Sequence, residues 1–173
     1  MPRARPAPSA APAGPARRAG PPAAPSGCSS FKLRQLSRRV SQQFDAIVGQ
    51  TGLKTTQYSL LSHIVRLGPV RPGRLAAAME MDASTLTRNL QPLVALGLAQ
   101  VGPGDDGRSR LISPTEAGRA KRIQARREWQ RAQRAFNSRV GAERVSRLHA
   151  VIDECLALLG EAAVADDEAA PAR

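Results

Sequence analysis

Apolar side chains recur at steps of three and four residues along most of the chain, the spacing that places them on one face of an α-helix. Gly, Pro and capping residues such as Asp82 separate these runs. The pattern predicts helices over about 33–47, 55–67, 72–79, 82–95, 115–140 and 145–159. Two short strands, Leu98–Val101 and Arg110–Ser113, flank a Gly- and Asp-rich loop, so the expected fold class is mainly α with one small β-hairpin.

The two ends of the chain lack a pattern that builds a core. Residues 1–27 are rich in Pro, Ala and Arg, and residues 161–173 are acidic with Val164 as their one large apolar side chain. Neither segment buries enough apolar surface to offset the entropy of ordering, so we expect both to be disordered tails. A cationic arm that contacts DNA is the alternative for the first. One domain is therefore expected at 28–160.

The charge of the chain is strongly positive. Its 173 residues include 26 Lys and Arg against 14 Asp and Glu, a net charge of +12. All but three of these cations are Arg, whose planar fork suits phosphates and the edges of bases. Most of the excess lies within 28–160, which favours a polyanionic partner such as double-stranded DNA.

Other kinds of site lack the residues they need. Two cysteines and two histidines have no metal-ligand spacing, so we expect no metal and no cofactor. No apolar run approaches the roughly 18 residues that span a bilayer, so we expect no membrane partner and a cytoplasmic protein. There is no Gly-rich phosphate loop or nucleophile elbow, and the adjacent Ser62 and His63 point to different helix faces. We therefore expect no catalytic residues and no enzyme.

A short helix, a turn, a capped helix and a basic hairpin form the pattern of a winged helix-turn-helix over about 55–114. In the capped helix, three leucines share one face, and side chains that can hydrogen-bond to base edges occupy the opposite face. Its first turn also presents backbone N–H groups that suit an anion. The residues expected to contact DNA from this helix are Ser84, Thr85, Arg88, Asn89 and Gln91. The alternative is an amphipathic surface helix with an ordinary polar side.

Three segments resemble the MarR family of bacterial transcription regulators. They are Gly52-Leu-Lys-Thr-Thr-Gln-Tyr-Ser-Leu-Leu61, Asp82-Ala-Ser-Thr-Leu-Thr-Arg-Asn-Leu90 with Leu96-Gly-Leu98, and Asp106-Gly-Arg108 followed by Ser113-Pro-Thr-Glu-Ala-Gly118. The third is the most specific, because the wing of the family typically bears Asp-x-Arg and its next helix typically opens with Thr-x-x-Gly. Pro92, inside the capped helix, departs from the pattern and predicts a modest kink.

The resemblance implies a homodimer that binds a pseudo-palindromic operator, commonly as a repressor that responds to a small aromatic or carboxylate effector. The dimer stem would come from 29–50 and 115–160, and the apolar seam predicted over 145–159 independently calls for a partner helix. In the wing, Arg108 would enter the minor groove, Asp106 would hold it in place, and Arg110 lies beside them.

An effector would bind between the stem and the winged domain. Arg38, Phe44, His63 and Trp129 are the candidate contacts there. Each has a plainer interpretation: Phe44 and Trp129 as core residues, His63 as a hydrogen-bonded boundary histidine, and Arg38 as a surface charge. The helix predicted over 115–140 adds an apolar stripe that includes Ile123, between many arginines. Beyond the first turn, where Arg119 and Arg122 lie nearest the wing, we expect these arginines to face solvent, with contacts to phosphates as the alternative.

Two other functions remain as alternatives. The basic domain could coat DNA without sequence preference through counterion release. It could also be a thiol-based redox regulator, since Cys28 lies near the expected start of the first helix. The hydroperoxide-sensing branch of the family has a reactive Cys where this chain has Ser30 and two Tyr where it has Phe44 and Thr55, which argues against this alternative. Cys155 is expected to be a small apolar core residue.

Overall fold

The computed structural model describes residues 26–104 and 109–168, with side chains described up to Gly160. Its helices are α1 (Ser29–Val48), α2 (Thr55–Leu67), α3 (Pro72–Ala78), α4 (Ala83–Ala95), α5 (Glu116–Val140) and α6 (Ala142–Glu168), with a 3₁₀ turn, η1, at Gly49–Thr51. Strands β1 (Ala99–Pro103) and β2 (Arg110–Pro114) form an antiparallel hairpin. The mainly α fold with a small hairpin is confirmed.

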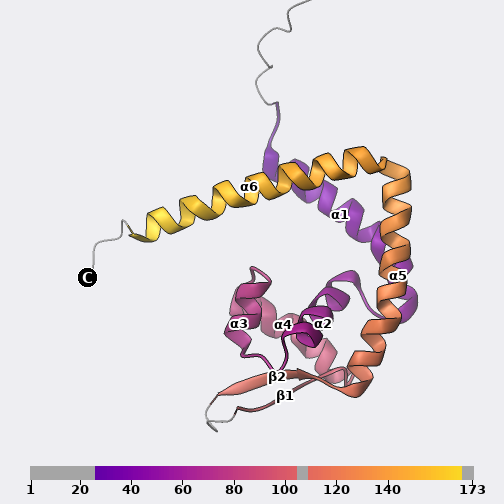
Figure 1. The fold of residues 1–173 in the computed structure, drawn as a ribbon, viewed down its shortest axis with the longest axis vertical. Coiled ribbons are helices and arrows are strands. Elements are labelled where there is room, and N and C mark those ends of the chain that lie inside the picture. Colours follow the sequence, from indigo (N-terminus) through magenta and orange to yellow (C-terminus); the bar gives the residue numbers. More distant parts are fainter. Residues whose placement is uncertain (1–25, 105–108, 169–173) are drawn as a thin grey trace, which may run out of the picture.

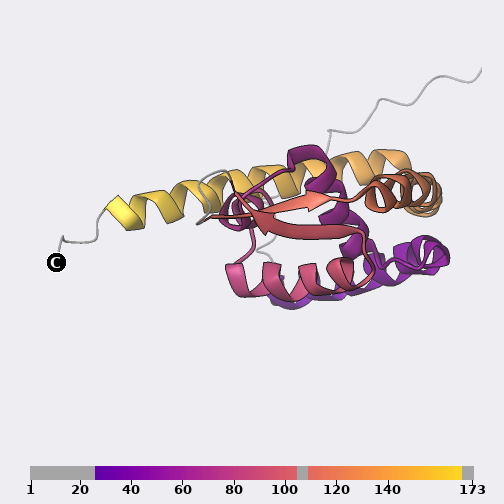
Figure 2. The same cartoon turned by 90° about the horizontal axis from the view of Figure 1, so that it is seen from below.

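The elements form two groups joined by α5. Figure 1 shows α2, α3, α4 and the hairpin gathered at one end, with α1 and α6 at the other. Helix α5 runs along one side from the hairpin to α6, and the far half of α6 continues past α1. In Figure 2 the hairpin faces the viewer and α6 extends beyond it. This separation places the predicted DNA-binding elements away from the predicted stem.

Aromatic pairs fix α5 against both groups. The rings of Phe44 on α1 and Phe136 on α5 have centroids 6.1 Å apart, and those of Tyr58 on α2 and Trp129 on α5 are 6.2 Å apart. The small buried side chain of Ala132 lets the helices approach between these pairs. Trp129 is half-buried and Phe44 is buried, in keeping with their interpretation as core residues.

The junction between α1 and α2 is held by polar contacts. Gly52 adopts a left-handed φ of 82°, which lets the chain reverse after η1. The Asp45 carboxylate then accepts a hydrogen bond of 2.7 Å from the backbone amide of Thr55, at the start of α2. The Lys121 ammonium group on α5 donates to the Thr51 carbonyl oxygen at 3.2 Å. These contacts tie the stem end of the chain to the winged end.

A third stretch of backbone extends the hairpin sheet. The register pairs Ala99 with Pro114 and Pro103 with Arg110. Val70, between α2 and α3, exchanges two backbone hydrogen bonds with Ile112, at 3.0 and 2.9 Å. A single bridging residue has no alternating pattern, so the sequence did not predict it. The bridge holds the segment that leads into α3 against Ile112, which pairs with Val101 in the middle of the hairpin.

Two sequence-based expectations differ from the structure. Ile123 is 55% exposed rather than part of the buried stripe of α5. The buried positions of α5 are spaced from Gly118 through Ala125 to Ala132, and 100° per residue places Ile123 on another side. Helix α6 also continues to Glu168, into the segment expected to be disordered. Ala and Glu dominate that extension and are strong helix formers, so α6 continues where the lack of core residues predicted disorder.

The remaining tail predictions, for residues 1–25 and 169–173, lie outside the described residues. None of the helices in the described ranges combines the length and apolar character needed to cross a membrane.

Candidate nucleic-acid interface

A tight turn sets the angle between α3 and α4. After α3, the amide of Met81 donates to the Ala76 carbonyl at 3.0 Å and the amide of Glu80 to that of Ala77 at 3.1 Å. This pair of bonds is a Schellman motif, in which the residue after the C-cap adopts a left-handed φ. Glu80 takes that role with a φ of 50°. The turn therefore places a residue with a Cβ atom where glycine is usually favoured.

Asp82 caps the N-terminus of α4. Its carboxylate accepts hydrogen bonds from the Ser84 hydroxyl at 2.6 Å, the Thr85 amide at 2.7 Å and the Thr85 hydroxyl at 2.8 Å. These bonds, the one from Ser84 foremost, hold the pKa of the Asp82 carboxyl well below its usual range. The predicted cap is confirmed. The carboxylate thus accepts from the Thr85 backbone amide in the first turn, where backbone N–H groups were predicted to suit an anion.

The outer face of α4 is polar and open. Ser84, Arg88 and Gln91 are exposed, whereas the three leucines on the opposite face are buried against the rest of the winged domain. Thr85 and Asn89 lie half-buried at one edge, and the Asn89 amide nitrogen is 3.9 Å from the Met81 sulfur. The sequence pattern therefore predicted the exposed face correctly, with Arg88 and Gln91 as its long side chains.

Pro92 does not end α4. The helix continues to Ala95, where the amide of Leu96 donates to the Pro92 carbonyl at 3.0 Å. Gly97 then adopts a φ of 66° and forms a second Schellman motif with its neighbour Leu98. The candidate contact residues from Ser84 to Gln91 all precede the proline, so its ring lies beyond them.

Part of the wing falls within the described residues. Arg110 is exposed at the start of β2, directly opposite Pro103. The Gly104 amide donates to the Ser109 carbonyl at 2.7 Å and closes the base of the loop. Asp106 and Arg108, the predicted minor-groove pair, lie outside the described residues.

A groove of about 660 Å³ separates α4 from the hairpin. Thr87, Gln91 and Val94 line it from α4, and Val101 and Arg110 line it from the two strands. Polar and cationic side chains of both elements therefore border one surface. Thr87 was not among the predicted contacts, and its position lies between the buried and outer faces of the helix.

The Thr-x-x-Gly segment connects this surface to the stem. The Thr115 hydroxyl accepts from the Gly118 amide at 3.0 Å and donates to the Gly97 carbonyl at 2.6 Å. A Cβ atom at Gly118 would overlap the carbonyl oxygen of Leu98. Threonine thus caps α5 and glycine lets α5 touch the chain that leaves α4. The spacing of this motif has a structural cause in the joint between α4 and α5.

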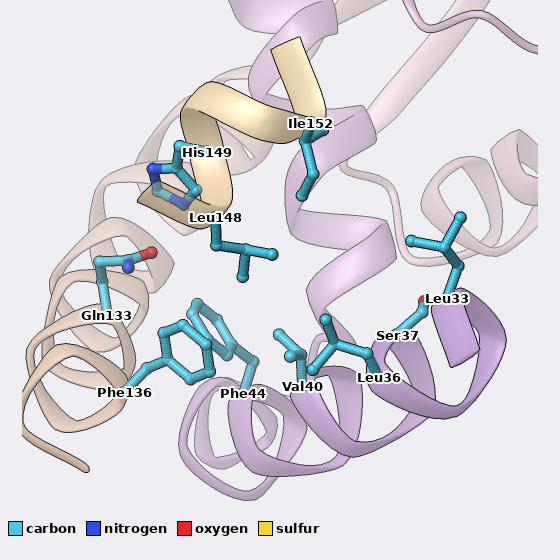
Figure 3. Close-up of a pocket in the computed structure, with 10 residues that line it drawn as sticks. All are labelled: Leu33, Leu36, Ser37, Val40, Phe44, Gln133, Phe136, Leu148, His149 and Ile152. Atoms are coloured by element: carbon cyan, nitrogen blue, oxygen red, sulfur yellow. The ribbon is translucent and has the colours of Figure 1, made fainter. Parts of the chain in front are cut away.

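One of the four candidate effector contacts, Phe44, lines the cavity between α1, α5 and α6. This cavity has a volume of about 360 Å³ and is shown in Figure 3, with Phe136 beside Phe44. Arg38, His63 and Trp129 do not line this cavity. Arg38 is exposed, and His63 Nδ1 lies 2.9 Å from the Ser59 carbonyl oxygen, within its own helix.

Some buried polar atoms of α2 and α5 were not found from the sequence. The hydroxyls of Thr55 and Ser62 on α2 and the Nε atom of Arg122 on α5 are buried without a hydrogen-bond partner among the described residues. Arg122 is half-buried, unlike its exposed neighbours Arg119 and Arg126 on the same helix. Arg126, beyond the first turn, is thus exposed as expected, whereas Arg122, nearer the wing, is not fully exposed.

Comparison with known proteins agrees with this geometry. The MarR-family model matches residues 51–109, which run from η1 into the wing. The solved structure of the Mycobacterium tuberculosis transcriptional regulator MosR is 32% identical, with 80% of this chain and 96% of that chain covered and a TM-score of 0.60. The chain belongs to the MarR family. No curated protein matches the sequence.

Members of the MarR family are DNA-binding transcriptional regulators and not enzymes. A structure of MosR in complex with DNA is 28% identical to this chain, with coverages of 75% and 98% and a TM-score of 0.60. An Escherichia coli MarR variant complexed with operator DNA is 20% identical, with coverages of 73% and 92% and a TM-score of 0.66, and shows the shared fold. This chain is accordingly a DNA-binding regulator of transcription.

Proposed function

We propose that this MarR-family regulator is a sequence-specific repressor that binds a pseudo-palindromic operator as a homodimer. The observation that carries the proposal is the outer face of α4, where Arg88 and Gln91 are exposed beside the hairpin that bears Arg110. Arg recognises guanine and Gln recognises adenine through paired hydrogen bonds in the major groove. Such a surface offers more than charge to DNA, which favours specific binding over uniform coating.

The proposed contacts divide between two grooves. From α4, Arg88, Gln91 and Ser84 face bases, while Thr85 and Asn89 at the edge face the backbone. From the wing, Arg108 enters the minor groove, with Asp106 and Arg110 as supporting residues. A narrow minor groove concentrates negative potential, so a single guanidinium gains most there.

The proposed stem comprises 29–50 and 115–160, with the winged domain at 55–114. Leu33 on α1 is 59% exposed, and Leu156 and Leu159 on α6 are 51% and 70% exposed. Val145, at the start of the same seam, is already buried within one protomer. The first part of the seam thus packs inside the protomer, and the exposed part is the proposed contact with the second copy. Cys155, expected in a core, is exposed in the protomer and lies on that part.

An effector is proposed to bind between the stem and the winged domain. The unpartnered hydroxyl of Ser62 on α2 and the Nε atom of Arg122 on α5 are hydrogen-bonding groups for a carboxylate or phenol. The same two helices meet where the rings of Tyr58 and Trp129 have centroids 6.2 Å apart. Leaving such groups unpaired costs free energy, which a ligand could recover. We propose a cytoplasmic location for the protein, where a bacterial regulator meets its operator.

Selection of bound genomic fragments, followed by nuclease footprinting of the best fragment, tests the specific function. We expect a bounded protected site made of two half-sites about one helical turn apart. Protection that spreads evenly along every fragment would instead show sequence-indifferent coating. A screen of small aromatic acids for release of the selected fragment then tests the effector.

Thiol regulation is the second candidate, because Cys28 is exposed at the N-cap position of α1. Against it, Phe44 is buried against Phe136 and supplies no phenol hydroxyl. We expect stoichiometric hydroperoxide to leave operator binding unchanged. A thiol-reversible loss of binding in the wild type, absent in Cys28→Ser, would make oxidation the signal.

A further inference from the structure

The hydroxyl groups in the first half of α4 all donate within the protein. Ser84 donates to the Asp82 carboxylate at 2.6 Å, Thr85 to the same carboxylate at 2.8 Å, and Thr87 to the Ala83 carbonyl oxygen at 2.8 Å. A hydroxyl carries one proton, and neither a carboxylate nor a carbonyl can donate in return. The direction of each bond is therefore fixed, and none of the three hydroxyls has a proton left for DNA.

Thr87 differs from the other two because its acceptor is helix backbone rather than the cap. Its β-carbon bears one hydroxyl and one methyl group, and this hydrogen bond selects the rotamer that keeps the hydroxyl against the preceding turn. Thr87 is nevertheless exposed, and it borders the groove between α4 and the hairpin together with Gln91. The hydroxyl oxygen can still accept a hydrogen bond, but its bond to Ala83 holds it against the preceding turn, so the group that an exposed Thr87 offers to a partner in the groove is its methyl.

We propose that Thr87 recognises thymine through this methyl group and is a specificity-determining residue of the regulator. This inference rests on the proposed function, in which α4 enters the major groove. Thymine alone among the four bases presents a methyl group there, and the methyl of threonine is a suitable apolar contact for it. Redirecting the hydroxyl proton to a base would exchange one hydrogen bond for another, whereas the methyl contact adds apolar burial without that loss.

The test removes the methyl group from either side of the contact. The probe is the duplex of highest affinity selected from a random pool, with each thymidine replaced in turn by deoxyuridine, which differs by that methyl group alone. The proteins are the wild type, Thr87→Ser, which keeps the hydroxyl, and Thr87→Val, which keeps a methyl group. Circular dichroism confirms that each variant is folded.

For the wild type, one deoxyuridine position per half-site should weaken binding about fourfold, the effect of one methyl group leaving apolar contact. Thr87→Val should bind like the wild type and show the same sensitivity. Thr87→Ser should bind the thymidine duplex about fourfold more weakly for each half-site, with no further loss on deoxyuridine. This non-additivity is the signature of a direct contact.

The inference is overturned if Thr87→Val loses binding while Thr87→Ser keeps it, because the hydroxyl would then be the group in contact. It is also overturned if no deoxyuridine position couples to residue 87. Arg88→Ala separates these outcomes from failure of the proposed function. If Arg88→Ala changes base preference while Thr87 shows no coupling, only the thymine contact is wrong; if neither residue affects preference, α4 does not recognise the operator.

Discussion

Single residues close the turns that orient α4. Asp82 and Thr115 accept backbone amides at the starts of α4 and α5, and Gly97 takes a left-handed conformation where α4 ends. These roles were predictable from the sequence, because each residue type has one strong local preference at a helix end. Glu80 was not predictable, since glutamate does not favour the left-handed φ that the turn before α4 imposes on it.

Replacing Glu80 with glycine should therefore stabilise the protein. The left-handed conformation costs a residue with a Cβ atom about 1 kcal/mol, and glycine avoids this cost. Glycine also loses more conformational entropy on folding than other residues, which offsets part of the gain. We expect Glu80→Gly to raise the free energy of unfolding by about 0.5 kcal/mol in urea titrations. Gly97→Ala, in the equivalent position after α4, should lower it by about 1 kcal/mol. If both variants changed the free energy of unfolding in the same direction, the left-handed conformations of residues 80 and 97 would be contradicted.

The cap of α4 should weaken in acid. Because the pKa of Asp82 is lowered in the folded state, its carboxylate stabilises folding above the unfolded pKa of about 3.9. That contribution declines as the pH falls below 3.9 toward the folded pKa. Asp82→Asn keeps an acceptor but does not titrate, so the stability gap between wild type and variant should shrink between pH 5 and pH 2.5. A stability difference between the two proteins that does not change with pH would show that the charge of Asp82 does not contribute.

Element boundaries follow from the sequence wherever a helix ends at a strong signal. The starts of α2 and α5 and the end of α1 agree with prediction, because Thr55, Thr115 and Gly49 stand where the apolar spacing changes. The bridge at Val70 escaped prediction, since it depends on Ile112, which is distant in the chain. The close approach between α5 and the segment after α4 is equally non-local, although the Thr-x-x-Gly pattern marked its position.

Because α5 lies so close to Leu98 at Gly118, a methyl group added there should affect stability differently from one added at an open glycine. Gly118→Ala should destabilise the protein by about 1 to 3 kcal/mol, because its Cβ atom would overlap the Leu98 carbonyl oxygen and push α5 from the hairpin. Gly73→Ala is the matched control in α3, where a Cβ atom meets open space. It should stabilise by about 0.4 to 1 kcal/mol. Thermal unfolding of both variants checks the contrast, and a harmless Gly118→Ala would refute the close contact.

The whole molecule presents apolar surface that one copy does not cover. Figure 1 shows the far half of α6 continuing past α1, and Leu159 on that half is 70% exposed. Sequence periodicity predicted the seam but could not divide it between contacts within one protomer and contacts with a second. The fold decides this, because Val145 lies in the core of the protomer whereas Leu156 and Leu159 are exposed.

A charge on the open part of α6 should separate the proposed dimer. Leu159→Asp alters no buried contact within the protomer, so we expect a folded monomer in sedimentation at micromolar concentration, with operator binding lost. Ala150→Asp introduces the same charge on the opposite side of α6, where Ala150 is exposed, and should remain dimeric. A dimer that tolerates Leu159→Asp would exclude this face as the interface.

The claim that the outer face of α4 recognises the operator is tested by a titration at fixed salt. The selected operator and single-base variants of its half-site are titrated with wild type, Arg88→Ala and Arg126→Ala. Arg126 is an exposed arginine on α5, so its loss removes the same charge away from α4. We predict that Arg88→Ala costs about 1 to 3 kcal/mol on the best operator and relaxes preference at one position per half-site, while Arg126→Ala does neither. Equal, sequence-independent losses for the two variants would contradict the claim.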